Sequence, residues 1–359
     1  MRIIIIGFGN VGQGFAKVLN MKNNFLMENF GISPKVVAIV DSKGAAINPN
    51  GLNLEKALYI KKLKRTVAFY PEYGKLGVNG LEILDNVDAE ILIEATPTNI
   101  VDGEPGLSFM LEAMRTGKHV ITANKGPLTV AFSKLWEESE KHDVQLKFDA
   151  TVGGAAPVIS LAEHCLSGNQ IVSIRGILNA TTNFILTKMD ENSFSIEEAI
   201  KEAREKGICE TDPTYDLKGI DTACKIVILA NALLKRRVTY KDLQKVEGIE
   251  KIEVKDLREA HKKGCTIKLV GLADESRLLV EPMLIPFNDR ICVGNTLNAV
   301  EFKTDLAKEI IIMGHGAGPI ETASKMLNDM IEILKPNKSL NKSRKSHWRL
   351  LYETKNQKV

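Results

Sequence analysis

The chain has 359 residues, of which 44% are hydrophobic and 26% are charged. At roughly 100–200 residues per domain, this length predicts about two domains, and the composition excludes an intrinsically disordered chain. The net charge of +3 includes a basic C-terminal segment, 336–359, in which seven Lys or Arg side chains accompany one acid, Glu353. We expect this segment to be a solvated tail, and we expect neither nucleic acid nor a membrane as a partner.

Strands alternate with helices in the first part of the chain. Residues 3–6 form a continuous branched apolar run, which is typical of a buried parallel strand. Further expected elements are a helix through Leu19, a strand at 36–40, a strand at 89–93, a helix at 108–116, a strand at 119–122, a helix at 129–141 and a strand at 144–148. This alternation predicts an α/β fold with a doubly wound parallel sheet of the Rossmann type.

The pattern changes after Asp149, where a glycine-rich turn occupies residues 151–157. Later expected elements are helices at 158–166, 195–206 and 221–235, strands at 171–178, 268–272, 277–285 and 297–303, and a last helix at 320–334. We therefore predict a dinucleotide-binding domain at 1–149, completed by helix 319–334. An α+β substrate-binding and dimerisation domain is expected at 150–313.

The cysteines and the short apolar run at 3–6 indicate the cellular compartment of the protein. Five cysteines, an odd number without a Cys-x-x-Cys pair, predict reduced thiols in a cytoplasmic protein rather than disulfides or a zinc site. The run at 3–6 is too short for a signal peptide or a membrane span.

A Gly-x-Gly-x-x-Gly motif lies between the first strand and the first helix. In this context the first glycine permits a tight turn, the second lets the backbone approach a pyrophosphate, and the third allows close helix–strand packing. The phosphates would then lie at backbone N–H groups of a helix N-terminus. The residues expected to bind the dinucleotide here are Gly7, Phe8, Gly9, Asn10, Val11 and Gly12.

Polar residues follow the next predicted parallel strands, whose carboxyl ends line a ligand crevice. Asp41 is placed to bind the ribose hydroxyls of NAD, although Lys43 two residues later could meet the 2′-phosphate of NADP. Thr96, Asn124 and Lys125 follow the third and fourth strands, which places them near cofactor and substrate.

An acidic loop leads into the helix at 221–235. It carries Glu210, Asp212, Asp216 and Asp221, and Lys225 follows Asp221 at the i, i+4 spacing that puts both on one helix face. Such a pair could move protons during hydride transfer. The alternative is an acidic first turn with an ordinary ion pair, and the spacing alone leaves both interpretations open.

At this loop the sequence resembles homoserine dehydrogenases. The resemblance covers most of the chain, from Gly7 to about Asp329, and its specific segments are 176–186, with the run Gly-Ile-Leu-Asn-Ala-Thr-Thr-Asn, and 210–225. Supporting segments are 7–12, 122–128, 150–157 and 314–322.

The resemblance implies reversible hydride transfer between L-homoserine and L-aspartate 4-semialdehyde, with NAD or NADP, in threonine and methionine biosynthesis. By motif match, Lys225 would be the catalytic acid/base and Lys125 would assist near the reacting oxygen or the nicotinamide. Glu210 would bind the substrate amino group, and Asp216 and Asp221 would bind or orient substrate. Further cofactor contacts would come from Thr96, Gly316 and the following residues to Gly318.

The resemblance also implies a monovalent cation, usually sodium, bound by backbone carbonyls of the glycine-rich turn. The matching positions are Val152, Gly154 and Ala156, with a carboxylate from Asp149, where most members of the family have glutamate. Hard oxygen ligands of this kind suit such an ion.

Two other functions stay open at this point: another two-domain amino-acid dehydrogenase that shares only the first domain, and an NAD-binding sensor without turnover. The chain is too short for an additional kinase or regulatory ACT domain, so we expect weak or no inhibition by threonine. We expect a homodimer, because two-fold dimers are the commonest oligomers.

Overall fold

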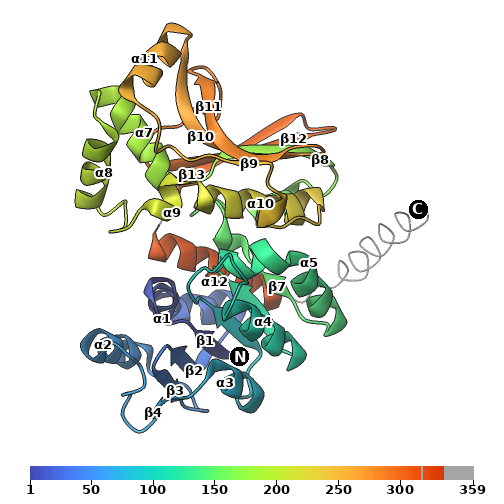
Figure 1. The fold of residues 1–359 in the computed structure, drawn as a ribbon. Helices are drawn as coiled ribbons and strands as arrows, with labels where there is room; N and C mark the ends of the chain where they lie inside the picture. The colour runs from blue at the N-terminus through green and yellow to red at the C-terminus, as the bar shows by residue number, and fades with distance from the viewer. Residues whose placement is uncertain (317, 335–359) are drawn as a thin grey trace.

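The computed structural model describes residues 1–316 and 318–334; the predicted tail at 336–359 and Ala317 lie outside the described residues. The described chain forms a seven-stranded and a six-stranded sheet, each with its own helices (Figure 1). We call the first sheet and its helices the first lobe, and the second sheet and its helices the second lobe. Within the described ranges, every helix is too short or too polar to cross a membrane.

The first lobe contains the predicted doubly wound sheet, in the order β4-β3-β2-β1-β5-β6-β7. Five of its strands run parallel: β1 (Arg2–Ile6), β2 (Lys35–Asp41), β5 (Ile91–Glu94), β6 (His119–Thr122) and β7 (Leu146–Lys147). Their carboxyl ends therefore meet at one edge, which is where ligands bind in such sheets.

Helices cover both faces of this sheet because successive side chains of a strand point to opposite sides. Ile3 and Ile5 pack with Phe15 of α1, whereas Ile4 and Ile6 pack with Met110 of α4. The helices of this lobe are α1 (Asn10–Phe30), α2 (Leu54–Lys64), α3 (Gly80–Asn86), α4 (Gly106–Arg115), α5 (Lys125–Lys141) and α12 (Pro319–Leu334).

The prediction of the first sheet was incomplete, because it contained the five parallel strands alone. Strands β3 (Gly44–Ile47) and β4 (Gly74–Leu76) extend it on the β2 side, and both pair antiparallel. Only two residues join Asp41 to its partner Gly44, which is a hairpin connection, too short for the crossover that parallel strands need. The first helix also continues to Phe30, so most of the long segment before β2 is helix rather than connection.

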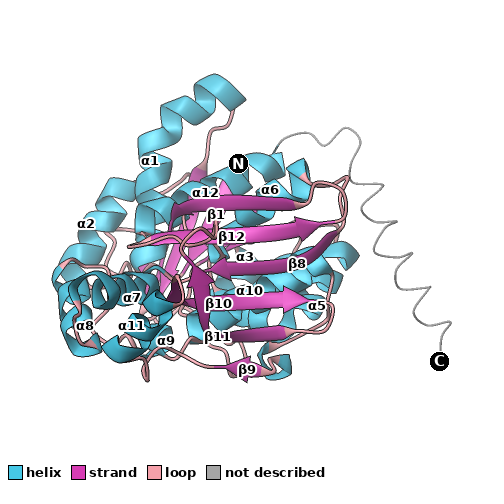
Figure 2. Cartoon of the chain, turned by 90° about the horizontal axis from the view of Figure 1, so that it is seen from above, coloured by secondary structure: helices cyan, strands magenta, loops and turns pink. Residues whose placement is uncertain are grey.

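The second lobe is built on a sheet in the order β13-β12-β8-β10-β11-β9. Its strands are β8 (Ile171–Ile177), β9 (Lys245–Val246), β10 (Cys265–Asp274), β11 (Leu278–Pro286), β12 (Leu297–Thr304) and β13 (Glu309–His315). Its longer helices are α6 (Val158–Cys165), α7 (Ala180–Asn192), α8 (Ile196–Glu205), α10 (Ile220–Leu234) and α11 (Val254–Lys262), with the short α9 (Thr214–Leu217). The predicted capping box of Ser195 and Glu198 opens α8. Figure 2 looks onto the face of the sheet opposite α10, where β12, β8, β10 and β11 lie in front of that helix.

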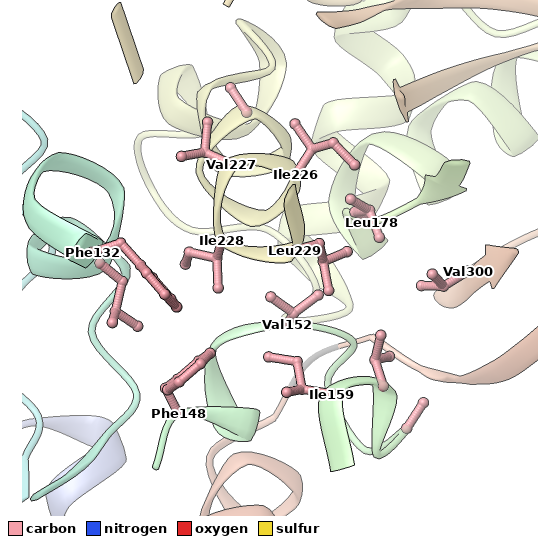
Figure 3. Close-up of a cluster of buried hydrophobic side chains, with 14 of the residues drawn as sticks. Phe132, Phe148, Val152, Ile159, Leu178, Ile226, Val227, Ile228, Leu229 and Val300 are labelled. Atoms are coloured by element: carbon pink, nitrogen blue, oxygen red, sulfur yellow. The ribbon is translucent and has the colours of Figure 1, made fainter. Parts of the chain in front are cut away.

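Helix α10 connects the two lobes through apolar packing. Ile228 on α10 faces Phe132 of α5 and Phe148, while Leu229 faces Val152 of the glycine-rich turn (Figure 3). Helix α12 then returns from the second lobe to the first, where it packs along α1. A Cβ on Gly14 of α1 would lie 2.7 Å from the carbonyl oxygen of Pro319, so the glycine permits this close approach.

Candidate active site

The glycine turn of the first lobe has the geometry that a dinucleotide pyrophosphate requires. Gly7 has φ +93°, and a Cβ on Gly12 would lie 2.0 Å from the Gly7 carbonyl oxygen, so neither position accepts a side chain. Nothing lies within 4 Å of a Cβ built on Gly9, which begins α1 without a side-chain cap. The open space at Gly9 and the helix N-terminus without a side-chain cap are compatible with the anion site that the motif predicts.

The other residues of this turn that were predicted to bind the cofactor differ in the exposure of their side chains. The Phe8 side chain is 1% exposed and packs in the core of the first lobe, so only its main chain faces a cofactor. Asn10 is exposed and Val11 half-buried at the first turn of α1.

Asp41 is a buried carboxylate whose acceptor positions are filled by the protein. One oxygen accepts hydrogen bonds from the backbone N–H of Lys43 (3.0 Å) and the Thr66 hydroxyl (2.8 Å). The other accepts from Lys61 Nζ (2.6 Å) and the backbone N–H of Val67 (2.9 Å). Because an ionised carboxylate offers about four acceptor sites, this set leaves none for a ribose hydroxyl. Burial raises the pKa of Asp41, but these donors outweigh it, and the pKa lies below its ordinary value.

Glu94 organises the carboxyl ends of β5 and β6. It is fully buried and accepts hydrogen bonds from the Thr96 backbone (2.8 Å), the Thr96 hydroxyl and the Thr122 hydroxyl (2.8 Å). Asn124 caps α5 through the Gly126 N–H and donates to Thr96 (3.2 Å), so the two predicted cofactor residues Thr96 and Asn124 are held side by side. Burial raises the pKa of Glu94, although its hydrogen bonds from Thr96, Thr122 and Asn124 oppose the rise.

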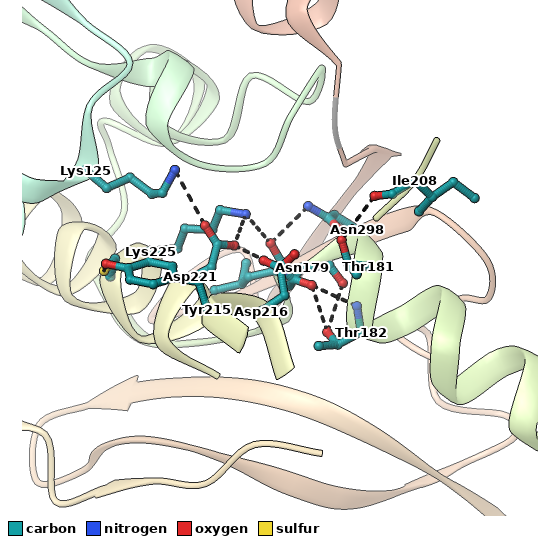
Figure 4. Close-up of polar contacts among 12 residues, drawn as sticks. Lys125, Asn179, Thr181, Thr182, Ile208, Tyr215, Asp216, Asp221, Lys225 and Asn298 are labelled. Carbon is teal, nitrogen blue, oxygen red and sulfur yellow. Dashed lines mark hydrogen bonds and ion pairs between the residues drawn. The ribbon is translucent and has the colours of Figure 1, made fainter. Parts of the chain in front are cut away.

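The acidic loop and α10 bring the predicted catalytic residues into contact. Lys225 Nζ lies 2.7 Å from Asp221 Oδ2 and donates to the carbonyl oxygen of Leu178 (2.6 Å). Lys125 Nζ, from the first lobe, lies 3.5 Å from Asp221 Oδ1 (Figure 4). Both Lys225 and Asp221 are 8% exposed. The pair is therefore a buried ion pair, and this resolves the alternative of an ordinary surface pair.

Asn179 positions the carboxylates of this cluster. Its side-chain amide donates to Asp216 Oδ1 (2.7 Å) and to Asp221 Oδ2 (2.9 Å), while its carbonyl oxygen caps α7 at Thr182 (Figure 4). Burial raises the pKa of Asp221, but Lys225 and Lys125 lower it more, so this carboxylate stays ionised. Burial and the charge of Asp221 raise the pKa of Asp216.

Three predicted residues lie apart from this hydrogen-bonded cluster. Glu210 is exposed in the loop before α9. Gly316 follows β13, and a Cβ there would lie 2.5 Å from the side-chain oxygen of Asn298, whose amide donates to Leu178 (3.2 Å). Gly318 has φ +150° directly before α12. Gly316 and Gly318 therefore sit where the chain crosses from the second lobe to the first.

Three of the four predicted cation ligands, Val152, Ala156 and Asp149, come together around a side chain of the protein, and Gly154 lies in the turn between them. Lys325 Nζ donates to the carbonyl oxygens of Val152 (2.6 Å) and Ala156 (2.8 Å) and lies 3.5 Å from Asp149 Oδ1. Asp149 also accepts hydrogen bonds from the backbone N–H of Ile159 (2.9 Å) and the hydroxyl of Ser160 (3.0 Å). The Lys325 ammonium thus occupies the position that a monovalent ion bound by these oxygens would take, and the donor set in this form does not fit such an ion. The cation that the resemblance implies stays a prediction.

Sequence reasoning missed three residues of the site. Asn179 lay within the specific run at 176–186, so the motif contained it without indicating its role. Glu94 ends a predicted strand, where a buried acid is a detectable signal. Lys325 lies in a helix far along the chain from its two acceptors, and no local pattern reveals that contact.

The fold and the site define a class of protein. A glycine turn at the N-terminus of α1 lies in one lobe, and a buried lysine–aspartate pair lies in the other, joined across the lobes by Lys125. This is the arrangement of a two-domain, nicotinamide-dependent oxidoreductase that acts on a CH–OH group.

The comparisons with known proteins identify the family. A family model described as homoserine dehydrogenase matches residues 157–331, and one described as glutamate/leucine/phenylalanine/valine dehydrogenase matches residues 1–106. A homoserine dehydrogenase of Methanocaldococcus jannaschii is 49% identical over 94% of this chain and 100% of its own length. A putative homoserine dehydrogenase of Archaeoglobus fulgidus has a solved structure with a TM-score of 0.85 and 39% identity, over 93% of this chain and 99% of that one. The chain belongs to the homoserine dehydrogenase family.

Relatives with both nicotinamide cofactors are similar to this chain. An NAD(+)-dependent homoserine dehydrogenase of Pseudomonas canavaninivorans is 33% identical over 92% of this chain and 96% of its own length. A mutant hyperthermophilic archaeal homoserine dehydrogenase in complex with NADPH has a TM-score of 0.80 and 26% identity, over 92% of this chain and 97% of that one. The cofactor is therefore NAD or NADP.

Proposed function

We propose that Lys225 is the acid/base in the interconversion of L-homoserine and L-aspartate 4-semialdehyde. The observation that carries this proposal is the buried contact of Lys225 with Asp221, at the place where Lys125 reaches across from the first lobe. NAD or NADP, held by its pyrophosphate at the glycine turn, would supply the acceptor for the hydride of the hydroxymethyl carbon of the substrate. In that direction Lys225 acts as the neutral amine, after releasing a proton to solvent, and takes the hydroxyl proton; in the reverse direction its ammonium gives a proton to the aldehyde oxygen.

The other charged residues position this proton transfer. Asp221 holds the Lys225 ammonium at a fixed point, and Asn179 holds Asp221. Lys125 supplies positive charge near the oxygen, which gains negative charge as the aldehyde is reduced. Asp216 and Glu210 provide carboxylates for the substrate ammonium, with Glu210 placed in an exposed loop from which it can reach a ligand.

An absorbance assay tests this function. Purified protein with L-homoserine and either NAD or NADP should produce reduced nicotinamide. L-2-aminobutyrate, which has the same carbon chain without the hydroxyl, should produce none. Absence of homoserine-dependent reduction with both cofactors would contradict the proposal.

We propose that Asp41 does not select NAD over NADP. Its oxygens are saturated by four protein donors, and Lys61 compensates its charge, so it offers neither a free acceptor to the ribose nor an unpaired charge to a 2′-phosphate. Comparison of kcat/KM for the two cofactors in the assay above measures the preference.

We also propose that two copies of the chain associate through the outer face of the second sheet. Ile177, Val270 and Ala299 on this face are already buried in one copy, where they cluster with Ile291 and Val293. The apolar surface left for a second copy is the β13 side of the face, where Met313 is 57% exposed and Ile311 is partly exposed. Two-fold dimers are the commonest oligomers, and such a contact would cover this surface with a second copy of itself. Light scattering should give a dimer mass, and Met313→Lys should shift it toward the monomer.

The five unpaired cysteine thiols support a cytoplasmic location.

A further inference from the structure

The Lys325 side chain occupies a nest of main-chain oxygens at the junction of the two lobes. The nest is the glycine-rich turn between the short 3-10 helix η1 (Asp149–Thr151) and α6, and its two acceptors are Val152 and Ala156. Gly153 and Gly154 have φ values of +84° and +59°. These left-handed conformations turn the carbonyl groups on either side toward a common centre, as in other main-chain ion sites.

We propose that Lys325 is a built-in replacement for a monovalent cation, so that this enzyme needs neither sodium nor potassium. Its Nζ lies within 2.8 Å of both carbonyl oxygens, which is the position that a metal ion bound by the same oxygens would take. The ammonium carries the same single positive charge as such an ion. Because Lys325 is part of the chain, its ammonium occupies the site without a separate step in which a free cation binds.

The surroundings show why a metal ion does not displace this ammonium. The Lys325 side chain is 2% exposed, so it cannot swing into solvent without unpacking α12. Asp149, 3.5 Å away, is a buried countercharge for one cation. Asp329, one helical turn after Lys325, is also buried, and burial raises its pKa well above its ordinary value, which disfavours a second negative charge there. Two cations at one carboxylate would repel each other strongly in this interior.

The glycine-rich turn that holds Lys325 also contacts the segment that joins the two lobes. The backbone N–H of Ala155 donates to the carbonyl oxygen of His315 (3.0 Å), and a Cβ on Gly154 would lie 2.3 Å from that oxygen. Residues after His315 lead into α12, which carries Lys325 itself. Lys325 therefore fixes the turn against the crossing between the lobes, next to the predicted cofactor residue Gly316. A cation in this place would have the same positioning effect.

Cation titration of the full-length protein tests the proposal. Rate and melting temperature are measured in NaCl and in KCl against choline chloride at equal ionic strength, after exhaustive exchange into choline. For the wild type we expect both quantities to be independent of the cation. A saturable increase of either with sodium or potassium would overturn the proposal. The melting temperature decides this even if the protein does not oxidise homoserine, so its outcome is separate from that of the proposed function.

The Lys325→Ala variant should convert the enzyme to cation dependence. Removing the ammonium leaves Asp149 and two carbonyl oxygens around an empty space, so the melting temperature in choline should fall, by on the order of 10 °C for a charge left buried without its partner. Sodium or potassium should restore part of that loss in a saturable manner, because a ligand that binds the native state stabilises it.

A matched control variant distinguishes an effect of cation binding from the general effect of removing a buried lysine. Lys268 is also buried, at 4% exposure, but it donates to the side chains of Asn183 and Thr187 rather than to a pair of carbonyl groups. Lys268→Ala should lower the melting temperature without rescue by either cation. If Lys325→Ala does not fold, Lys325→Gln, which keeps a shorter, polar and uncharged side chain, is titrated instead. A Lys325 variant that responds to cations no more than the Lys268 variant does would overturn the proposal.

Discussion

The two candidate ligand-binding regions of this enzyme differ in the groups that form them: one consists of backbone and the other of charged side chains. The dinucleotide turn of the first lobe consists of backbone, and it works because Gly7, Gly9 and Gly12 have no side chains. The substrate cluster of the second lobe consists of buried charged side chains, which are held by one another and by Asn179. The first region should therefore fail when atoms are added, and the second should fail when charges are removed.

The largest effect is expected from Lys225→Ala. Loss of the acid/base should lower kcat by about 10²–10⁴-fold. Binding of reduced cofactor, measured by its fluorescence, should be unchanged because the glycine turn lies in the other lobe. Lys235→Ala, at the exposed end of the same helix, is the control and should keep its activity. Full turnover in the Lys225 variant would remove Lys225 from the mechanism.

Adding a methyl group to the glycine turn should give two different results. Gly12→Ala places a Cβ against the Gly7 carbonyl oxygen, and overpacking of this kind costs about 1–3 kcal/mol of stability. Gly9→Ala meets nothing within 4 Å in the protein, so its melting temperature should match the wild type. Its KM for the cofactor should rise, about tenfold for each 1.4 kcal/mol of lost binding. Equal melting temperatures for both variants would contradict the packing described for Gly12.

Asp41→Ala tests whether a charged side chain in the first lobe is structural. Four donors would lose their acceptor, among them the Lys61 ammonium, at a cost of about 1–3 kcal/mol for buried unsatisfied groups. We expect a lower melting temperature and similar changes in KM for NAD and NADP. An unchanged melting temperature with a selective loss of NAD binding would instead support the ribose contact that the sequence predicts.

The smallest effect concerns Glu94 and pH. The folded-state pKa of this buried carboxyl is raised above the ordinary value of 4.5. Above pH 4.5 the unfolded state ionises while the folded state retains its proton, so stability decreases as pH rises toward the folded-state pKa. Denaturant unfolding of Glu94→Gln at several pH values should lack this decrease. The same pH slope in both proteins would assign it to another group.

Much of the first lobe could be predicted from sequence because its signals are local. A branched apolar run followed by spaced glycines predicts a strand, a turn and a helix from neighbouring residues alone. The region from Gly44 to Asn86 was missed because α2 buries only Ala57 and has no marked apolar face. Helix α7 was missed for the opposite reason: most of its side chains are buried, so the helical period is hidden.

The active site could be predicted as a set of residues but not as a set of contacts. Asp221 and Lys225 share a helix, so their spacing indicates their pairing. The contacts of Asp41 with Thr66 and of Lys325 with Val152 join segments distant in the chain, and only the packed structure reveals them. In both cases a residue predicted to bind a ligand, Asp41 in one and Val152 in the other, already has a protein donor at its acceptor oxygen.

The ion pair of Lys125 with Asp221 has a consequence for how the enzyme responds to its solvent. It is a charged contact between lobes that must separate if the cleft opens to release product, and 21% of the Lys125 side chain is exposed. Dissolved ions reach such a partly exposed pair and weaken it within a Debye length of about 8 Å at physiological ionic strength. Raising the concentration of an inert electrolyte should therefore weaken this contact between the lobes, and, if product release requires the lobes to separate, it should shorten the residence time of product.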